Sequence, residues 1–463
     1  MVCREHADNL HTCVAHRLDT CIQLLVIGIK RTYTRELKAS SKEVVVKGWV
    51  HDVRLMGGIS FVLLRDMDGI VQVTAHKKNA EPELLKQIAG LHNEDVIAVK
   101  GVVQKTSKTK SGIEIAPKEI VKLNPSEPVL PLDPRKVTKA HLDTRLDWRV
   151  LDLRSPENMA VFKIQSMLML AMEEFLSKNK FLKVFTPSLI GGISEGGSEV
   201  FPVVYFNKQV FLRQDPQLHR ELLIAAGFER IFETGPSWRA EKSHTVRHMT
   251  EHRTIAAEIA FIDDEHDVIS VEENMVVYAL DKVSKDCKEQ LDLLGKTITI
   301  PKPPFPELQF PKVYDILEEL GKPIQKGEDL NREAEEALGE YVKDKFKSEF
   351  FFVNRFPSEV KPFYVMRVDS EPKWARSIDL MFKGMELSSG GQREHRYEKL
   401  VSQAKEKELD LESVKWFTEV FKYGVPSMGG FSLGIERFTM KLLDMENVRE
   451  ATLFPRDPER ILP

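Results

Sequence analysis

Five short segments in which apolar and polar residues alternate constrain the fold of this chain more than any other feature of its sequence. They read EVVVKGWVHDV, ISFVLLRD, GIVQVTA, DVIAVKGVVQ and IEIAPKEIVKL, within residues 43–123. A period of two indicates half-buried strands, the Gly-rich or Asp-Gly stretches between them indicate turns, and DMDGI is a hairpin signal. Five such strands predict a small closed barrel, and the oligonucleotide-binding (OB) type is the commonest of this size.

A proline-rich segment, NPSEPVLPLDPRK, follows the predicted barrel. Proline has no N–H for a sheet ladder and favours extended backbone, so this segment is typical of a linker. Ser155 and Pro156 then begin a pattern of helical spacing. The chain has 463 residues, enough for a second, larger core. We expect an irregular extension at 1–30, the barrel at 31–125, a linker at 126–155 and a second domain at 156–463.

The N-terminal residues show no pattern of a metal site or a membrane segment. Cys3, Cys13 and Cys21 are three of only four cysteines, and their spacing fits no zinc motif. The apolar run CIQLLVIGI is far shorter than the roughly 20 residues of a membrane span. We interpret this part as an irregular extension, or as an upstream start that the functional chain does not use, and we expect a cytoplasmic protein with reduced thiols.

The charge pattern limits the ways in which this chain can hold a nucleotide or a nucleic acid. The formal net charge is -4 with 30% charged residues, so a nucleic acid would have to bind to local basic patches. The sequence has no G-x-x-x-x-G-K-[ST] motif and no G-x-G-x-x-G coupled to a strand. We therefore expect any nucleotide to be held without a phosphate-binding glycine loop.

The stretch SWRAEKSHTVRHMTEHRTIAAEIAF, residues 237–261, brings cations and carboxylates close together. Arg239 ends one alternating run, and Arg247 with His248 precedes another, so a strand–loop–strand hairpin would clamp a ligand from two sides. Guanidinium and imidazolium donors can hold a polyphosphate, and Glu241 can accept from an exocyclic amine. A solvated, charge-rich surface is the alternative interpretation.

Two further elements strengthen the prediction of a nucleotide site. In SIDLMFKGMELSSGGQREHR, a turn at Gly384 would bring Asp379 and Glu386 together, and with Ser389 they offer the hard oxygen ligands that Mg²⁺ prefers. In MGGFSLGIERFTMKLL, a glycine-rich strand runs into a helix that carries Arg437 near its start, where it can meet a phosphate or a base. Structural salt bridges and a glycine-packed core strand are the alternatives.

Together these elements resemble the class II aminoacyl-tRNA synthetases, and more closely their aspartate enzymes of archaeal and eukaryotic type. FLKVFTPSLI with Pro187, SWRAEKSHTVRHMTE and GGFSLGIERF are similar to the three motifs of that family, and the likeness runs from about residue 40 to the C-terminus. RLDWRVLDLR, SEGGSEVFP, ELSSGGQREHR and LFPRD are similar to aspartate-subgroup stretches. The resemblance implies an α+β protein: a five-stranded OB-fold barrel that binds the anticodon, and an antiparallel catalytic sheet flanked by helices, in a homodimer that uses the first motif.

The resemblance also implies roles for individual residues. Arg239 would contact the α-phosphate and Glu241 the adenine, while Arg247, His248 and Arg437 would bind the far end of a bent ATP. Asp379, Glu386 and Ser389 would lie around Mg²⁺, and Glu386 would also belong to the ATP site. Catalysis would rest on positioning and charge neutralisation by Arg239 and Arg437. The amino acid's carboxylate would attack the α-phosphate, and the acyl group would then pass to the tRNA 3′ end.

For the amino acid, the resemblance implies that Arg393 meets the side-chain carboxylate, with Gln217 nearby and Glu195 in a loop over the ammonium. In the barrel, Arg54, Phe61 and Gln72 match positions that read the anticodon, a set that suits stacking and pairing of unstacked bases. His51 stands where relatives that charge both tRNA(Asp) and tRNA(Asn) often have histidine. Lys110, in a lysine-bearing loop, does not match their companion residue. We expect charging of tRNA(Asp), with dual charging as the alternative.

The sequence departs from the aspartate family at the amino-acid pocket. The family's QSPQLYK reads QDPQLHR here, so Asp215 replaces a serine and Arg220 a lysine; SIDxE reads TIAAE, so Ala256 replaces an aspartate. Asp215 could supply the charge missing at Ala256 and pair with the substrate ammonium. Alternatively it could repel a substrate carboxylate, or neutralise a cation and favour an amide. His252 also stands where an aromatic side chain commonly stacks on adenine.

These observations predict an ATP- and Mg²⁺-dependent aspartate–tRNA ligase that acts as a homodimer. The first alternative is charging with asparagine, or a paralogous amino-acid ligase with an altered substrate, since Asp215, Arg220 and Ala256 change the pocket. The second is a non-catalytic tRNA-binding protein. The second alternative would have lost ATP or metal residues, and Arg239, His248, Asp379, Glu386 and Arg437 are all present. It is therefore ranked last.

Overall fold

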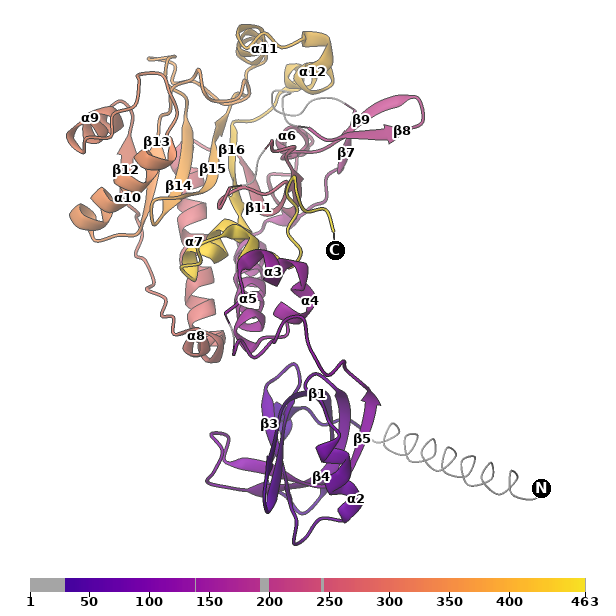
Figure 1. Ribbon diagram of the computed structural model, residues 1–463. Coiled ribbons are helices and arrows are strands. Elements are labelled where there is room, and N and C mark those ends of the chain that lie inside the picture. Colours follow the sequence, from indigo (N-terminus) through magenta and orange to yellow (C-terminus); the bar gives the residue numbers. More distant parts are fainter. Residues whose placement is uncertain (1–29, 138, 192–199, 243–244, 463) are drawn as a thin grey trace. The chain divides into compact units, whose positions relative to one another are not determined.

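The computed structural model describes residues 30–137, 139–191, 200–242 and 245–462. Contacts divide the chain into two compact units, Met1–Asp152 and Leu153–Pro463 (Figure 1). The predicted extension at 1–30 lies outside the described residues except for Lys30. The domain limits drawn from the sequence stay a prediction. Within the described residues, no helix is both long and apolar enough to cross a membrane.

The first unit holds the predicted barrel. It closes in the order β1-β2-β3-β5-β4, and all five strands fall where the alternation predicts them: β1 (Glu43–Met56), β2 (Ile59–Arg65), β3 (Ile70–His76), β4 (Val96–Lys105) and β5 (Ile113–Asn124). Inward-facing residues such as Val62, Leu64 and Val73 are fully or almost fully buried and form a core of their own. The predicted five-stranded barrel is confirmed.

The alternation does not reveal a short helix, α2 (Pro82–Ala89), that lies between β3 and β4. Its start at Pro82 and its apolar Leu84 and Ile88, four residues apart, are a helix signal, and both apolar side chains are buried against the barrel core. Two short helices follow the linker, α3 (Leu142–Asp147) and α4 (Arg149–Asp152).

The second unit is built on an eight-stranded sheet in the order β12-β13-β14-β15-β16-β11-β10-β6. Adjacent strands from β13 to β10 are antiparallel, whereas β6 and β12, at the two ends, pair in parallel. The strands are β6 (Leu182–Lys183), β10 (Arg230–Trp238), β11 (Glu251–Ala260), β12 (Glu307–Gln309), β13 (Phe350–Asn354), β14 (Ser377–Phe382), β15 (Glu386–Arg393) and β16 (Met428–Gly434). With the flanking helices, this sheet confirms the predicted α+β class.

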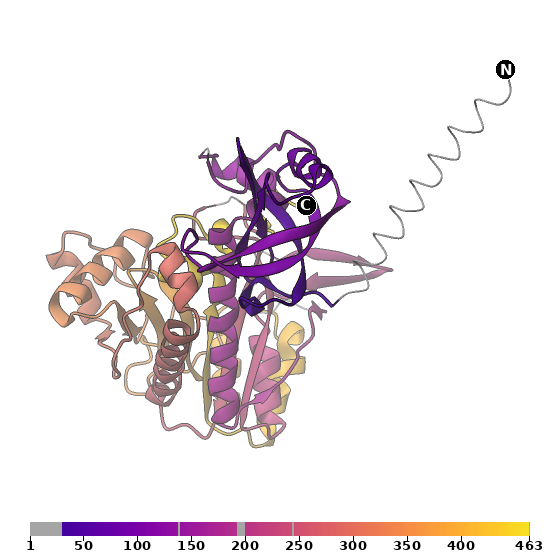
Figure 2. The ribbon, with the colours of Figure 1, turned by 90° about the horizontal axis from the view of Figure 1, so that it is seen from below.

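Two long helices, α5 (Pro156–Lys178) and α7 (Glu265–Asp286), pack side by side against one face of this sheet (Figures 1 and 2). As predicted, α5 begins after Ser155, whose side chain accepts a hydrogen bond from the N–H of Asn158 and caps the helix. Ala257 and Phe431 of the sheet contribute to the core beneath these helices. On the opposite face, Phe351 and Val353 of β13 belong to a second core, so only part of that face is left for a ligand.

Shorter elements surround the sheet. The helices are α6 (Gln217–Ala225), α8 (Lys288–Leu294), α9 (Lys312–Glu319), α10 (Arg332–Phe346), α11 (Tyr397–Glu406), α12 (Leu411–Thr418) and α13 (Ile435–Leu442). A small separate sheet has the order β7-β9-β8, with β7 (Leu189–Ile190), β8 (Pro202–Tyr205) and β9 (Lys208–Leu212). The chain between β9 and α6 carries Asp215 toward the large sheet.

Candidate active site

A cavity of about 540 Å³ lies on the face of the large sheet opposite α5 and α7. Its walls come from segments far apart in the sequence, because the strands that carry them are neighbours in the sheet. The predicted site residues that line it are Asp215, Gln217, Arg239, Glu241, Arg247, His248, Asp379, Glu386, Ser389, Arg393 and Arg437. The ATP, metal and amino-acid sets predicted from the sequence thus lie around one space, whereas their roles stay predictions.

A row of paired residues crosses five strands on the cavity side of the sheet, and Asp379, Ser389 and Ser432 of this row line the cavity. Asp379 pairs with Ser389, Ser389 with Ser432, Ser432 with Ala256, and Ala256 with Glu233. Because successive side chains on a strand point to opposite faces, Ala256 belongs to the cavity face and its neighbour Ala257 to the helix face. The two alanines therefore have different surroundings.

The predicted hairpin of β10 and β11 is confirmed, and it positions the cations that are predicted to bind phosphate. The backbone N–H of Arg239 donates to the carbonyl of Thr250 over 2.9 Å, which closes the hairpin beyond β10. Arg247 forms an ion pair with Glu335 of α10. The Arg437 guanidinium donates to the carbonyl of Arg247 over 3.3 Å, so this arginine is fixed against the hairpin loop.

Both histidines of this wall are neutral imidazoles near neutral pH. Burial, and then Arg437 and Arg247, lower the pKa of His248. Burial, and then Arg239 and Arg437, lower the pKa of His252 to about 3. Without a ligand, the guanidiniums around His248 disfavour a further positive charge, and the role of this histidine as a donor to a phosphate stays a prediction.

The acidic residues of the predicted metal site lie on the hairpin of β14 and β15, as predicted. The turn between them has Gly384 at a φ of +67°, a conformation that favours glycine. Burial raises the pKa of Asp379 to about 7. Burial would also raise the pKa of Glu386, but Arg437 and other nearby cations bring it below its usual value. Asp379 Oδ1 is buried without a hydrogen-bond partner.

These donors fit Mg²⁺. Two carboxylates and a hydroxyl are hard oxygen ligands, and the orphaned Asp379 oxygen on the cavity wall is available to one more partner. Lys361, which the sequence analysis did not single out, donates to Asp379 Oδ2 over 3.1 Å and lies 3.6 Å from the centre of the Phe356 ring. In the sequence, Lys361 is distinguished only by its position between two prolines of a loop. Its ion pair with Asp379 could therefore not be predicted from residue spacing.

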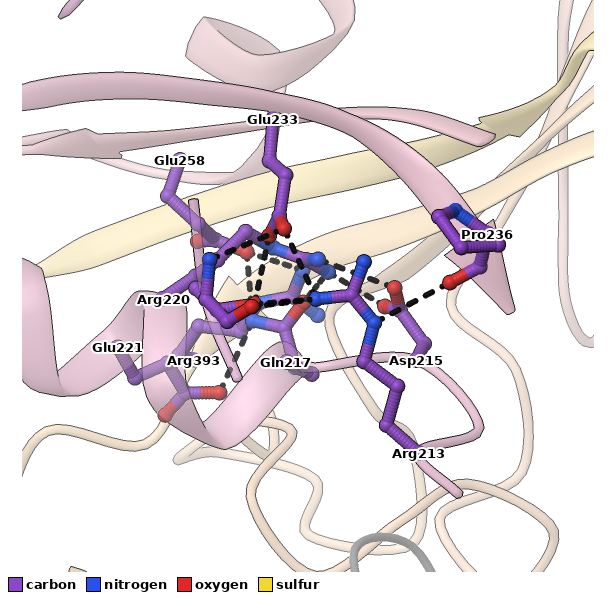
Figure 3. Close-up of polar contacts among 10 residues, drawn as sticks. Arg213, Asp215, Gln217, Arg220, Glu221, Glu233, Pro236, Glu258 and Arg393 are labelled. Carbon is purple, nitrogen blue, oxygen red and sulfur yellow. Dashed lines mark hydrogen bonds and ion pairs between the residues drawn. The ribbon is translucent and has the colours of Figure 1, made fainter. Parts of the chain in front are cut away.

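The end of the cavity predicted to hold the amino acid is a network of buried charges (Figure 3). Arg220 donates through Nη1 to Asp215 over 3.0 Å, forms a second bond from Nη2 to the other carboxylate oxygen, and reaches Gln217 over 2.8 Å. Arg393 donates to Glu258 over 2.8 Å. Neither the pairing of Glu258 with Arg393 nor the presence of Glu221 in the network was predicted from the sequence.

The Gln217 amide connects the parts of this network. Its Nε2 donates to Glu258 over 2.5 Å and to Glu221 over 3.1 Å. Glu221 on α6 is fully buried, and burial raises its pKa to about 8, so it is mainly protonated near neutral pH. Glu195, the predicted contact of the ammonium, lies outside the described residues.

Three of the four anticodon residues predicted in the barrel share one outward face. Arg54 is paired in register with Phe61, and Phe61 with Thr74, while Gln72 is the partner of Leu63 in the next row. Three neighbouring strands thus bring Arg54, Phe61 and Gln72 together. Arg54 forms an ion pair with Asp52 at 2.8 Å.

His51, the fourth predicted anticodon residue, lies beside the Arg65–Glu94 ion pair of the same barrel. Its Nδ1 is 3.1 Å from Arg65 Nη1, and Arg65 forms a buried pair with Glu94 at 2.8 Å. Because a guanidinium can only donate, Nδ1 accepts, and the remaining ring N–H on Nε2 can donate to a ligand. Burial and then Arg65 lower the pKa of His51, which keeps the ring neutral.

Residues 141–458 match the family described as tRNA synthetases class II (D, K and N), and residues 44–123 match an OB-fold nucleic acid binding domain. The chain belongs to the class II aminoacyl-tRNA synthetases. The predicted fold, an OB-fold barrel with a class II catalytic domain, is thereby confirmed. Synthetases of this class are ligases that use ATP and Mg²⁺ to join an amino acid to tRNA, in agreement with the predicted substrates and metal.

This synthetase is similar to named archaeal relatives over nearly its whole length. It is 46% identical to the aspartate–tRNA(Asp) ligase of Pyrococcus furiosus over 94% of this chain and 100% of that protein. It is 44% identical, with the same coverage, to the aspartate–tRNA(Asp/Asn) ligase of Methanopyrus kandleri. Its structure also superposes on the asparaginyl-tRNA synthetase of Pyrococcus horikoshii complexed with asparaginyl-adenylate, with a TM-score of 0.88, 30% identity and coverage of 94% and 100%.

Proposed function

We propose that this synthetase is an ATP-dependent aspartate–tRNA ligase that works through an aminoacyl-adenylate. The observation that carries the proposal is the convergence of Arg239, Arg437, Asp379, Glu386 and Arg393 on one cavity. The relatives named as aspartate ligases, which this chain matches over almost all of its length, support the same conclusion.

In the first step, the cavity orients a bent ATP against the amino acid. Arg239 contacts the α-phosphate and Glu241 the adenine, while Arg247, His248 and Arg437 hold the far end of the triphosphate. The carboxylate of the amino acid attacks the α-phosphate, an oxygen–phosphorus bond forms, and pyrophosphate leaves. Positioning and neutralisation of charge by fixed guanidiniums supply the catalysis, because no side-chain nucleophile is needed.

Asp379, Glu386 and Ser389 would hold Mg²⁺, which supplies charge neutralisation at the phosphates when bound. Lys361 holds one oxygen of Asp379 and leaves the other for the metal. Glu386 is ionised, because the surrounding cations lower its pKa. These contacts keep the acidic wall in place before the substrates arrive.

In the second step, the acyl group passes from the adenylate to the 3′ end of tRNA, while the barrel binds the anticodon. Phe61 offers a stacking face, and Arg54 and Gln72 offer polar contacts. Lys105 at the end of β4, and Lys108 and Lys110 in the loop after it, add contacts to the phosphate backbone.

Aspartate-dependent exchange of pyrophosphate into ATP tests the first step with the purified chain. Aspartate should support exchange, and Arg437→Gln should lower kcat/KM by at least about a hundredfold, because one transition-state charge loses its partner. An unchanged melting temperature of the variant shows that folding is intact. Silence of the wild type with both aspartate and asparagine would remove the proposal.

Charging of both tRNA(Asp) and tRNA(Asn) is a second candidate, which the Asp/Asn relatives and His51 favour. Because its Nε2–H is available to a base, His51 can contact the anticodon in either tRNA. Charging assays with the two purified tRNAs decide between the candidates, since exclusive use of tRNA(Asp) excludes dual charging.

A homodimer is also proposed, on the resemblance of FLKVFTPSLI to the first motif. Leu182, Phe185 and Leu189 in and beside this stretch are exposed, with Phe185 at 81%, and an exposed apolar strip suits a subunit interface. Light scattering on the purified protein tests this, because a mass of one chain, 53.0 kDa, would contradict it. A cytoplasmic location stays a proposal from the low cysteine content.

A further inference from the structure

The two arginines at the amino-acid end of the cavity are not equally available to a ligand. Arg393 lines the cavity, whereas Arg220 does not, and Asp215 occupies the wall in front of it. The Arg220 side chain is 1% exposed, and that of Asp215, its bidentate partner, is 18% exposed. In Figure 3, Asp215 and Arg220 point toward one another within the network. Asp215 therefore screens this guanidinium from an incoming substrate.

The charges at this end cancel before any substrate binds. Arg220 is matched by Asp215, and Arg393 by Glu258 at 2.8 Å. Arg213 is matched by Glu233 at 2.9 Å, and Glu221 is mainly protonated because burial raises its pKa to about 8. A carboxylate that enters this end meets Asp215 as a neighbour of like charge, and a neutral amide does not.

A cation without a partner would favour an acidic side chain strongly, because a buried charge needs a counter-charge. Of the two arginines, Arg393 is the one that lines the cavity, and its Nε is buried without a hydrogen-bond partner among the described residues. An amide oxygen and a carboxylate oxygen can both accept from this donor. Contact with Arg393 alone therefore discriminates less between an aspartate and an asparagine side chain than two unpaired cations would.

We propose that Asp215 is a specificity-determining residue: by closing an ion pair with Arg220, it leaves discrimination between an anionic and an amide side chain to Arg393, so that the synthetase activates asparagine as well as aspartate. This inference rests on the proposed function, since it concerns the amino acid that the same site activates. It decides between the two roles open to Asp215, in favour of neutralising a cation over pairing with the substrate ammonium.

A ladder of net charge tests the inference by ATP–pyrophosphate exchange with aspartate and with asparagine. Asp215→Asn adds one positive charge to the pocket, Arg220→Gln removes one, and the double variant returns the charge to that of the wild type. The ratio of kcat/KM for aspartate to that for asparagine should rise about tenfold in the first, fall about tenfold in the second, and return to within about twofold in the double variant.

Asp133→Asn is the matched control, because it removes a carboxylate from another Asp–Arg pair, with Arg135 at 2.7 Å, that does not line the cavity. Its ratio should equal that of the wild type. Asp215→Asn leaves Arg220 buried and unpaired, so melting temperatures are measured for all variants. If it does not fold, Arg220→Gln and the double variant still test the order of the ratios.

Two results would overturn the inference: a ratio that does not follow net charge, or an equal loss of both amino acids in Asp215→Asn, which would make Asp215 the partner of the ammonium. A wild type that exchanges with neither amino acid would instead remove the proposed function. In that case, the shifts in melting temperature caused by free aspartate and by free asparagine, which need no turnover, are compared across the same series of variants. The inference is supported if the difference between the two shifts changes with the net charge of the pocket, and contradicted if it does not.

Discussion

At the scale of the residue, burial sets the protonation states on which this site depends. In water at neutral pH, Glu221 would be ionised and His252 would be protonated in part, and burial is the first cause that keeps each of them neutral. Asp215 is different, because Arg220 outweighs the effect of burial and lowers its pKa. The Asp215 carboxylate therefore keeps its charge in a buried position because a guanidinium of opposite sign touches it.

His252 gives a prediction for ATP binding. Because its pKa is about 3, replacing it with phenylalanine removes no charge, while a larger aromatic face stacks better on adenine. His252→Phe should lower the KM for ATP by about two- to fivefold in pyrophosphate exchange, and His252→Ala should raise it. An equal rise in both variants would show that the imidazole makes a polar contact instead.

Glu272 of α7 gives a prediction for pH dependence. It is fully buried, Ser388 donates to its Oε1, and burial raises its pKa from 4.5 to about 8. The folded chain keeps this proton while the unfolded chain releases it, so the free energy of unfolding falls as pH rises from 4.5 toward 8. Glu272→Gln should lose this slope and be more stable near pH 8 by about 2–3 kcal/mol.

Urea unfolding of Glu272→Gln between about pH 5 and pH 8 provides the measurement. Glu319→Gln on α9, at an exposed position, is the control and should behave as the wild type. If Glu272→Gln keeps the pH dependence of the free energy of unfolding, that dependence comes from other buried acids. One such acid is Glu436, because burial raises its pKa to about 7.

At the scale of the element, close approaches of backbone position the acidic hairpin. A Cβ on Gly339 of α10 would lie 2.6 Å from the Gly384 Cα, so the absence of a side chain lets the helix touch the β14–β15 turn. Gly→Ala inside a helix ordinarily adds up to about 1 kcal/mol of stability. Here the clash reverses the sign.

Gly339→Ala should therefore destabilise the protein by about 1–3 kcal/mol and lower pyrophosphate exchange, because the displaced turn carries Glu386 with it. Gly57→Ala is the control, since a Cβ there meets nothing within 4 Å. Chemical denaturation and exchange at several Mg²⁺ concentrations test both variants. A more stable Gly339→Ala would mean that the helix and turn can separate without cost.

Elements with a strong local pattern were predictable from the sequence, and pairings across the fold were not. The barrel strands, α5 with its Ser155 cap, and the two site hairpins follow from periodicity, capping and turn chemistry, which act over a few residues. The parallel end strands β6 and β12 are two and three residues long, too short for a periodic signal. Lys361 and Glu258 act through partners 18 and 135 residues away, and no spacing rule links them.

At the scale of the whole molecule, the residues proposed to read the anticodon and those proposed to activate the amino acid belong to different compact units. The barrel has its own buried core, and the catalytic sheet has another. No residue predicted to read the anticodon lines the cavity. A change on the outward face of the barrel should therefore weaken tRNA binding without altering activation of the amino acid.

Substitution of Phe61 tests this separation. Its side chain lies at a partly exposed position of β2, where a base can stack on the ring. Phe61→Ala should raise the KM for tRNA by at least about tenfold, from a stacking loss of about 1–3 kcal/mol, while the rate of aspartate-dependent exchange stays unchanged. Val62→Ala, at a fully buried neighbouring position, is the contrast: it should lower the stability of the barrel and affect tRNA only through folding. Loss of exchange in a folded Phe61→Ala would contradict the separation, because activation would then depend on the barrel even without tRNA.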